Sequence, residues 1–288
     1  MKPSSATLPP PSTCPACEGT HIEVIGDMPL YVDGGNVPDT VVRCTGCGTY
    51  MRVADYADDT VRTHFNVASY TNTSAEERFR RVRIDWLAHL IRFALRHLGK
   101  PATDLRVLDI GPSYGHYVDL FQQQGARCTV VELVDILRER LAARGFAAHP
   151  HIDDIAPGET FDIVSAIDSL YYFQEPAAIL TKMRSRIAPG GLLLLRVTNR
   201  PPTFALMRKL GMTMTADRFG DAKFNYSEAG ITRLLERTGF TIDTIYLREP
   251  GKHHLSKTTA LYYQLTLLAS KLTGRHLTPG LTIIARPI

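Results

Sequence analysis

The amino-acid sequence predicts an α/β protein whose core is an open, doubly wound, mostly parallel sheet, preceded by a small metal-binding ribbon. Three observations predict this fold. They are a glycine-bounded turn between an apolar strand and a helix, an acidic residue at the end of the next strand, and two Cys-x-x-Cys pairs near the N-terminus. In open α/β sheets such a turn holds a nucleoside ligand at the carboxyl end of the first strand. With 288 residues, 44% of them hydrophobic, the chain can build this core.

The first thirteen residues, 1–13, are rich in proline and serine and contain no apolar core, so we expect a disordered leader rather than a signal peptide. No stretch approaches the ~18 consecutive apolar residues that a membrane span needs. We therefore expect a cytoplasmic protein without a membrane span. The net charge of +4 is mild and is spread along the chain, which permits an acidic substrate without indicating one.

Residues 14–50 are predicted to form a zinc ribbon. They contain two Cys-x-x-Cys pairs that supply four thiolates, which are Cys14, Cys17, Cys44 and Cys47. Such pairs can close a tetrahedron around one zinc ion, with rubredoxin-like iron as the alternative. So short a segment cannot bury enough apolar surface to fold alone, and metal binding, worth on the order of 10 kcal/mol in zinc-finger peptides, would supply the missing stability. Four protein ligands leave no open position, so a structural zinc is expected.

Residues 51–100 are predicted to form a helical linker or cap before the main domain, residues 101–288. Apolar side chains recur at helical spacing from Ala75 to Leu98, and Gly99-Lys100-Pro101 ends the helix. Four arginines within this helix are expected to form a solvated face; they are Arg78, Arg80, Arg81 and Arg83.

The glycine-bounded turn follows the apolar stretch Arg106 to Ile110 and precedes a predicted helix from Tyr117 to Gln124. Gly111 and Gly115 suit a backbone that approaches a ligand closely. Asp109 lies two residues before the first glycine, where its carboxylate would repel the pyrophosphate of a dinucleotide. A cationic ligand fits better, and S-adenosylmethionine carries both an ammonium and a sulfonium group.

A second acidic residue supports a nucleoside ligand. Glu132 ends the next predicted strand, Arg127 to Val131, and lies 21 residues after Gly111. An acidic side chain at roughly this distance from the glycine turn is placed to accept hydrogen bonds from ribose hydroxyls.

From Arg106 to Asn199 the sequence resembles the class I S-adenosylmethionine-dependent methyltransferases. The resemblance rests on four motifs in order: Asp109-Ile-Gly111-x-x-x-Gly115, Val131-Glu132-Leu133, Phe161 to Leu170, and Ile187 to Val197 with its Pro-Gly-Gly turn. It implies a seven-stranded Rossmann-like sheet in which the closing strand, Leu281 to Arg286, is antiparallel. The position of the family's middle glycine is Ser113, and Tyr171-Tyr172-Phe173 stand where many relatives carry a histidine.

The resemblance also implies roles for individual residues. Asp109, with Gly111, Ser113 and Gly115, would hold the methionine end of the cofactor. Glu132 and Leu133 would hold the ribose, Asp153 or Asp154 the adenine amine, and Asp168 would border the methyl-transfer site. An acceptor that must lose a proton also needs a base. The candidates are Tyr171, Tyr172 and His116, with the pair His253-His254 as a further one.

A four-cysteine ribbon before such a domain resembles a group of bacterial methyltransferases, some of which act on sugars or other small metabolites. We therefore expect methyl transfer to a small-molecule acceptor of the sugar or secondary-metabolite type, with O-, N- and C-methylation left open. The ribbon has few basic residues, so an RNA methyltransferase with a nucleic-acid-binding ribbon is ranked second.

Two further alternatives come from other functional classes. The run Gly111-Pro-Ser113-Tyr-Gly115 also spells the Gly-x-Ser-x-Gly nucleophile elbow of α/β-hydrolases, which would make Ser113 the nucleophile. A methyltransferase-like binding module without activity is the other alternative. Between the fifth strand and the next helix, the insertion Thr203 to Lys223 contributes Met and Phe side chains that either line a substrate pocket or simply pack.

Overall fold

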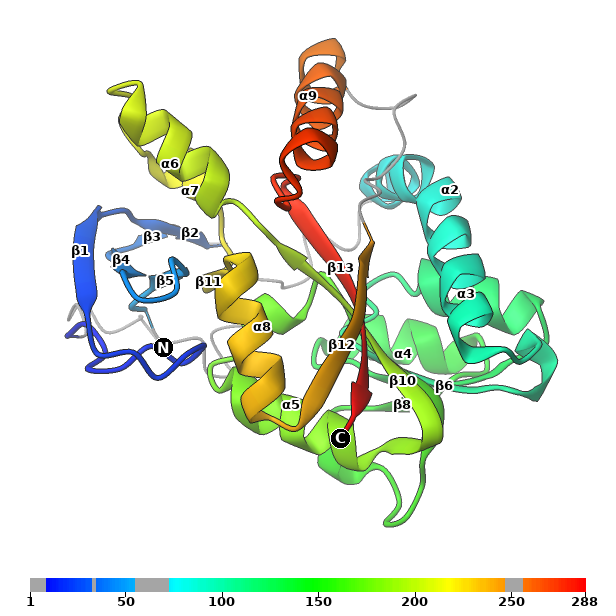
Figure 1. Cartoon of the computed structure of the whole chain (residues 1–288). Coiled ribbons are helices and arrows are strands. Elements are labelled where there is room, and N and C mark those ends of the chain that lie inside the picture. The colour runs from blue at the N-terminus through cyan, green and yellow to red at the C-terminus, as the bar shows by residue number, and fades with distance from the viewer. Residues whose placement is uncertain (1–8, 33–34, 55–72, 247–255) are drawn as a thin grey trace.

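In the computed structural model, residues 9–32, 35–54, 73–246 and 256–288 are described. Their largest element is a seven-stranded sheet with the strand order β12-β13-β10-β9-β6-β7-β8, shown in Figure 1. Its strands are β6 (Arg106–Ile110), β7 (Arg127–Val131), β8 (Ala147–His149), β9 (Phe161–Ile167), β10 (Ile187–Thr198), β12 (Phe240–Tyr246) and β13 (Gly280–Pro287). Strands β6 to β10 pair in parallel, whereas β13 is antiparallel to both β10 and β12. The predicted fold class and the antiparallel closing strand are confirmed.

Helices cover both faces of this sheet because its buried strands are apolar on both sides. Leu192 and Leu194 of β10 pack with α2 (Thr73–Leu98), α3 (His116–Gln123) and α4 (Asp135–Ala143). Leu193 and Leu195 pack on the other face with α5 (Pro176–Ser185) and α8 (Glu228–Arg237). Figure 1 shows the two helical layers on opposite sides of the strands. The remaining helices are α6 (Pro201–Lys209), α7 (Ala216–Phe219), α9 (Lys257–Thr273) and the short η1 (Ala102–Asp104), η2 (Ile152–Asp154) and η3 (Leu170–Tyr172).

The N-terminal ribbon is built into the rest of the protein. A four-stranded sheet contains β1 (Ile22–Asp27), β4 (Thr40–Cys44) and β5 (Tyr50–Arg52), and its fourth strand is β11 (Phe224–Asn225) from the C-terminal half. A separate pair joins β2 (Leu30–Val32) to β3 (Gly35–Val37). The expected boundary between residues 50 and 51 thus falls inside β5. The buried salt bridge between Arg52 and Asp39, 2.8 Å long, fixes this strand within the ribbon.

Several expectations concern residues outside the described ranges. Most of the predicted leader (1–8), part of the linker (55–72) and the pair His253-His254 fall there. Within the described ranges, no helix combines the length and the apolar character that crossing a membrane requires.

Candidate functional site

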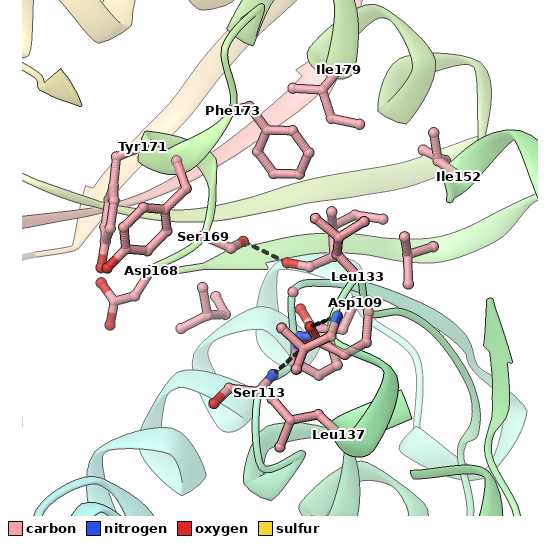
Figure 2. A pocket seen from close by; sticks show the side chains of 18 of the residues that line it. Asp109, Ser113, Leu133, Leu137, Ile152, Asp168, Ser169, Tyr171, Phe173 and Ile179 are labelled. Atoms are coloured by element: carbon pink, nitrogen blue, oxygen red, sulfur yellow. Dashed lines mark hydrogen bonds between the residues drawn. The ribbon is translucent and has the colours of Figure 1, made fainter. Parts of the chain in front are cut away.

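A cavity of about 500 Å³ opens at the carboxyl ends of β6, β7 and β9. Ten of the residues predicted from sequence line it. They are Asp109, Gly111, Ser113, His116, Glu132, Leu133, Asp153, Asp168, Tyr171 and Tyr172. Figure 2 shows Asp168 and Tyr171 together on one side of the pocket, apart from Asp109, Ser113 and Leu133. Gly115 and Asp154 lie outside the lining.

The turn after β6 has the backbone that the glycines predict. Gly111 has φ 72°, and a Cβ on it would lie 2.6 Å from Cβ of Ser169. Gly115 has φ 79° and precedes the first residue of α3. Ser113 also takes a left-handed conformation, with φ 54°. The serine therefore keeps a backbone shape that usually favours glycine.

Asp109 is 1% exposed, and its carboxylate accepts a hydrogen bond of 2.7 Å from the Ser165 hydroxyl. Burial raises the pKa of Asp109 to about 7, because a desolvated carboxylate without a cationic partner is unfavourable. No ion pair neutralises it within the described residues.

Glu132 is 6% exposed and is held by two backbone amides. The N–H groups of Ser113 and Val134 each donate to one carboxylate oxygen at 3.0 Å. Burial again dominates and raises the pKa of Glu132 to about 7. Two buried carboxylates that lack an ion-pair partner in the described part of the chain thus line one cavity. A ligand that brings a positive charge and hydroxyl donors would satisfy both.

The structure separates the two candidates for contact with adenine. Asp153 lines the cavity and forms an exposed ion pair with Lys182 at 2.5 Å. Asp154 accepts a hydrogen bond of 2.9 Å from the backbone amide of His151 and caps η2 outside the cavity.

Asp168, at the end of β9, is 7% exposed and lies between two arginines. Arg83 of α2 contacts one carboxylate oxygen at 2.7 Å, and Arg196 of β10 contacts the other. Burial alone would raise the pKa of Asp168, but the two guanidinium charges hold it below its ordinary value. The prediction of a solvated arginine face is therefore wrong for Arg83, whose side chain is 22% exposed and lines the pocket. Helical periodicity does not predict this pocket position of Arg83, because residue 83 lies beside the apolar stripe of the helix and not within it.

The three candidate bases differ in protonation. Burial raises the pKa of Tyr171 well above its ordinary value, so its hydroxyl stays protonated. The hydroxyl of Tyr172 donates to Asp221 at 3.0 Å. Burial lowers the pKa of His116 to about 4, with a further contribution from the Arg144 charge, so this ring is neutral near pH 7. Its Nε2 atom is buried without a hydrogen-bond partner in the described residues.

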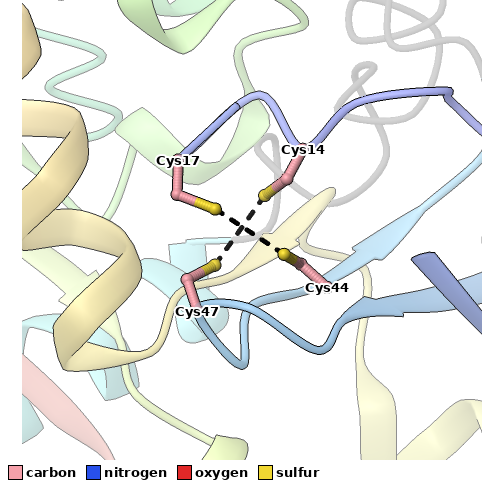
Figure 3. A group of neighbouring side chains, drawn as sticks. All are labelled: Cys14, Cys17, Cys44 and Cys47. Atoms are coloured by element: carbon pink, nitrogen blue, oxygen red, sulfur yellow. Dashed lines mark hydrogen bonds between the residues drawn. The ribbon is translucent and has the colours of Figure 1, made fainter. Parts of the chain in front are cut away.

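The four N-terminal cysteines converge, as Figure 3 shows. Their sulfur atoms all lie within 4.8 Å of one another, with Cys14 and Cys47 at 3.8 Å and Cys17 and Cys44 at 3.6 Å. A disulfide needs about 2.05 Å between sulfurs. A tetrahedral zinc site with Zn–S bonds of about 2.3 Å gives sulfur separations of about 3.8 Å. The donor set and its spacing therefore fit a zinc ion.

The insertion after β10 packs against the ribbon and not in the cavity. Phe204 and Phe219 stack at 5.6 Å, and Phe204 meets Tyr50 of β5 edge-on at 5.1 Å. Among the described residues, no hydrogen bond that would activate Ser113 as a nucleophile joins its hydroxyl to a histidine.

A family profile described as a methyltransferase domain matches residues 75–245 of this chain. Among curated proteins, a ubiquinone biosynthesis O-methyltransferase of Xanthomonas euvesicatoria pv. vesicatoria (strain 85-10) is 27% identical over 176 residues, which cover 55% of this chain and 73% of that protein. The protein of the same name from Xanthomonas campestris pv. campestris (strain B100) is 31% identical over 136 residues, 43% of this chain and 53% of the relative.

Two solved structures have a similar fold. The 1,6-didemethyltoxoflavin-N1-methyltransferase of Burkholderia thailandensis has a TM-score of 0.53 and 18% identity, covering 90% of this chain and 99% of that one. The magnesium protoporphyrin IX methyltransferase of Synechocystis PCC 6803, solved with bound S-adenosylhomocysteine, has a TM-score of 0.50 and 16% identity, covering 81% and 100%.

Proposed function

The chain belongs to the S-adenosylmethionine-dependent class I methyltransferases, and on this premise we propose that it methylates a hydroxyl group of a small-molecule acceptor. The assignment of the cavity to S-adenosylmethionine rests on one observation: two buried carboxylates, Asp109 and Glu132, line it. The choice of oxygen is supported by the curated relatives, which are named O-methyltransferases. The toxoflavin enzyme supports a small acceptor.

The pocket residues divide between the two ends of the cavity. We assign Asp109 and the Gly111–Gly115 turn to the methionine end, Glu132 and Leu133 to the ribose, and Asp153 to the adenine amine. The cofactor supplies an activated methyl group on sulfur. The protein then has to hold the acceptor oxygen in line with that methyl group and exclude water, which can lower the barrier by several kcal/mol.

The acceptor end is bounded by Asp168, Tyr171 and His116. Ion pairs with Arg83 and Arg196 hold the Asp168 carboxylate in place at the boundary of the acceptor site. His116 is the candidate general base by position, because it lines the cavity and its Nε2 has no hydrogen-bond partner among the described residues. The hydroxyls of Tyr171 and Tyr172 are assigned to acceptor positioning.

We also propose that the four cysteines bind one structural zinc ion. Zinc prefers thiolate ligands in a tetrahedron, and four protein ligands leave no site for substrate. The ion would therefore stabilise the ribbon and take no part in methyl transfer.

Methyl-labelled S-adenosylmethionine tests the proposed reaction. We expect label to pass to hydroxylated small molecules such as catechols, and not to RNA. The controls are acceptors in which the hydroxyl is replaced by hydrogen. Label found on RNA, with steeply salt-dependent RNA binding, would contradict the small-molecule assignment. Cofactor binding without transfer to any acceptor would indicate a binding module.

Cofactor affinity is expected to rise between pH 6 and pH 7.5, by almost tenfold for each of the two carboxyls that must lose its proton. Asp109 and Glu132 both have a pKa of about 7 in the free protein, so at pH 6 they are largely protonated and must lose protons to accept a ligand cation and ribose hydroxyls. Both pKa values are raised from ordinary values of 3.8 and 4.5, so the stability of the free protein falls as pH rises from about 4 to about 7 and levels off above that. Calorimetry in buffers of different ionisation enthalpy measures affinity and proton release together. An affinity that is flat or falls over this range would contradict the assignment.

A further inference from the structure

Helix α9 exposes most of its leucines to solvent, unlike an ordinary surface helix. Four of its five leucines, at positions 261, 265, 268 and 272, are 55%, 57%, 55% and 78% exposed, whereas Leu267 is half-buried. Ser270 is instead the buried residue of this helix, and it donates a hydrogen bond of 2.7 Å to the carbonyl of Thr266. A surface helix normally turns its leucines inward and its hydroxyls outward. We call these four leucines the leucine face.

The neighbouring helix α6 adds to this apolar surface. Leu206, Leu210 and Met212 on and just after α6 are 57%, 66% and 43% exposed. A hydrogen bond between Thr203 and Tyr262 joins α6 to α9. The side-chain amide of Asn199 also donates to the carbonyls of His276 and Thr278, at 2.8 and 2.9 Å, so the start of one helix is tied to the end of the other. Figure 1 shows both helices projecting beyond the same end of the sheet.

The two segments that contain α6 and α9 are basic. Residues 199–216 and 256–279 contain no aspartate or glutamate. Five basic residues in these segments are exposed; they are Arg208, Lys209, Lys257, Lys271 and Arg275. Exposed leucines flanked by lysine and arginine are typical of helices that lie in the interface of an anionic bilayer.

A second copy of this chain is the other occupant to consider, because the 4-3-4 spacing of the leucine face also suits a helix pair. Charge argues against it. In a parallel pair each lysine of α9 would lie near its own counterpart, which brings like charges together. In an antiparallel pair no acid of α9 could face a lysine of the other copy, because residues 256–279 contain no aspartate or glutamate. An anionic lipid surface complements the same lysines.

We propose that α9 and α6 dock this protein on an anionic phospholipid bilayer. The position of the two helices relates the docking to the cofactor cavity. Helix α6 follows the carboxyl end of β10, and α9 precedes the start of antiparallel β13, where Gly280 pairs with Thr198. The cofactor cavity opens at this same end of the sheet, where the parallel strands have their carboxyl ends. Docking turns that edge toward the lipid, so an acceptor that partitions into the bilayer is the expected class; this last step rests on the proposed function.

Vesicle sedimentation of the full chain tests the docking. We expect the protein to sediment with vesicles of phosphatidylcholine mixed with phosphatidylglycerol at low salt, and not with phosphatidylcholine alone or at high salt. Leu265→Ser and Leu268→Ser should each weaken the partition about tenfold. The matched control is Val24→Ser, because Val24 of β1 is 57% exposed and belongs to neither α6 nor α9. Its partition should equal that of the parent protein.

Three results would overturn the proposal. The first is no sedimentation with anionic vesicles. The second is a dimer in solution that Leu265→Ser dissociates, which would assign the leucine face to a second copy. The third is a lower melting temperature of Leu265→Ser without vesicles, which would show that the chain itself covers the face. Cofactor calorimetry on the same variants should give unchanged affinity, so failure of the docking is separable from failure of the proposed function.

Discussion

Asp109→Asn is expected to weaken S-adenosylmethionine binding at least 30-fold while the fold remains intact. The carboxylate is 1% exposed and has no ion-pair partner in the described residues, so its charge is available for a cationic ligand. A hydrogen bond to a charged group contributes about 1.5–3 kcal/mol, and 1.4 kcal/mol corresponds to a tenfold change in affinity. Asparagine has the same shape and can keep a hydrogen bond with Ser165.

Stability distinguishes this effect from misfolding. Burial of a charge raises the pKa of Asp109 to about 7, so a neutral amide removes an unfavourable desolvation. The melting temperature of the free variant at pH 8 should therefore equal or exceed that of the parent. Calorimetry measures the affinity, and Asp104→Asn is the control, because Asp104 is an exposed acid outside the cavity. Undiminished affinity in Asp109→Asn would remove the electrostatic basis of the cofactor assignment.

The parts of the fold that local patterns determine could be predicted from the sequence. Gly111 and Gly115 predicted the turn after the first sheet strand, because only certain residues readily take positive φ there. The apolar runs predicted the central strands, and the two Cys-x-x-Cys pairs predicted a cluster that the structure brings within 4.8 Å. Each of these signals lies within a few residues of the feature that it predicts.

Most of the remaining features depend on contacts between distant segments. The contact of Arg83 with Asp168 joins α2 to the end of β9, and nothing in the helical pattern distinguishes Arg83 from its solvated neighbours. The choice between Asp153 and Asp154 depends on which carboxylate caps η2, a local geometry that spacing does not determine. Strand β11 is two residues long and has no detectable pattern, yet it completes the ribbon sheet.

Cys17→Ser is expected to lose zinc and to lower the melting temperature of the whole protein by on the order of 10 °C. Zinc binding contributes on the order of 10 kcal/mol to folding in small zinc domains, and part of it is lost with one of the four ligands. For a protein of this size, 1 kcal/mol shifts the melting temperature by about 2–4 °C. Elemental analysis measures the metal and calorimetry the transition. Cys128→Ser is the control, because Cys128 is also partly buried and lies outside the cluster.

The contacts between ribbon and main domain predict one shifted transition rather than two. Arg237 of α8 reaches Glu18 at 2.7 Å and the carbonyl of Pro15 at 2.5 Å. The Ser227 hydroxyl that caps α8 donates to the carbonyl of Cys47 at 2.5 Å. Loss of the metal therefore removes contacts at both ends of α8 together with the strand pairing of β11. A variant that loses zinc but melts in two steps, with the cofactor-stabilised step unchanged, would show that the ribbon folds independently and would contradict this coupling.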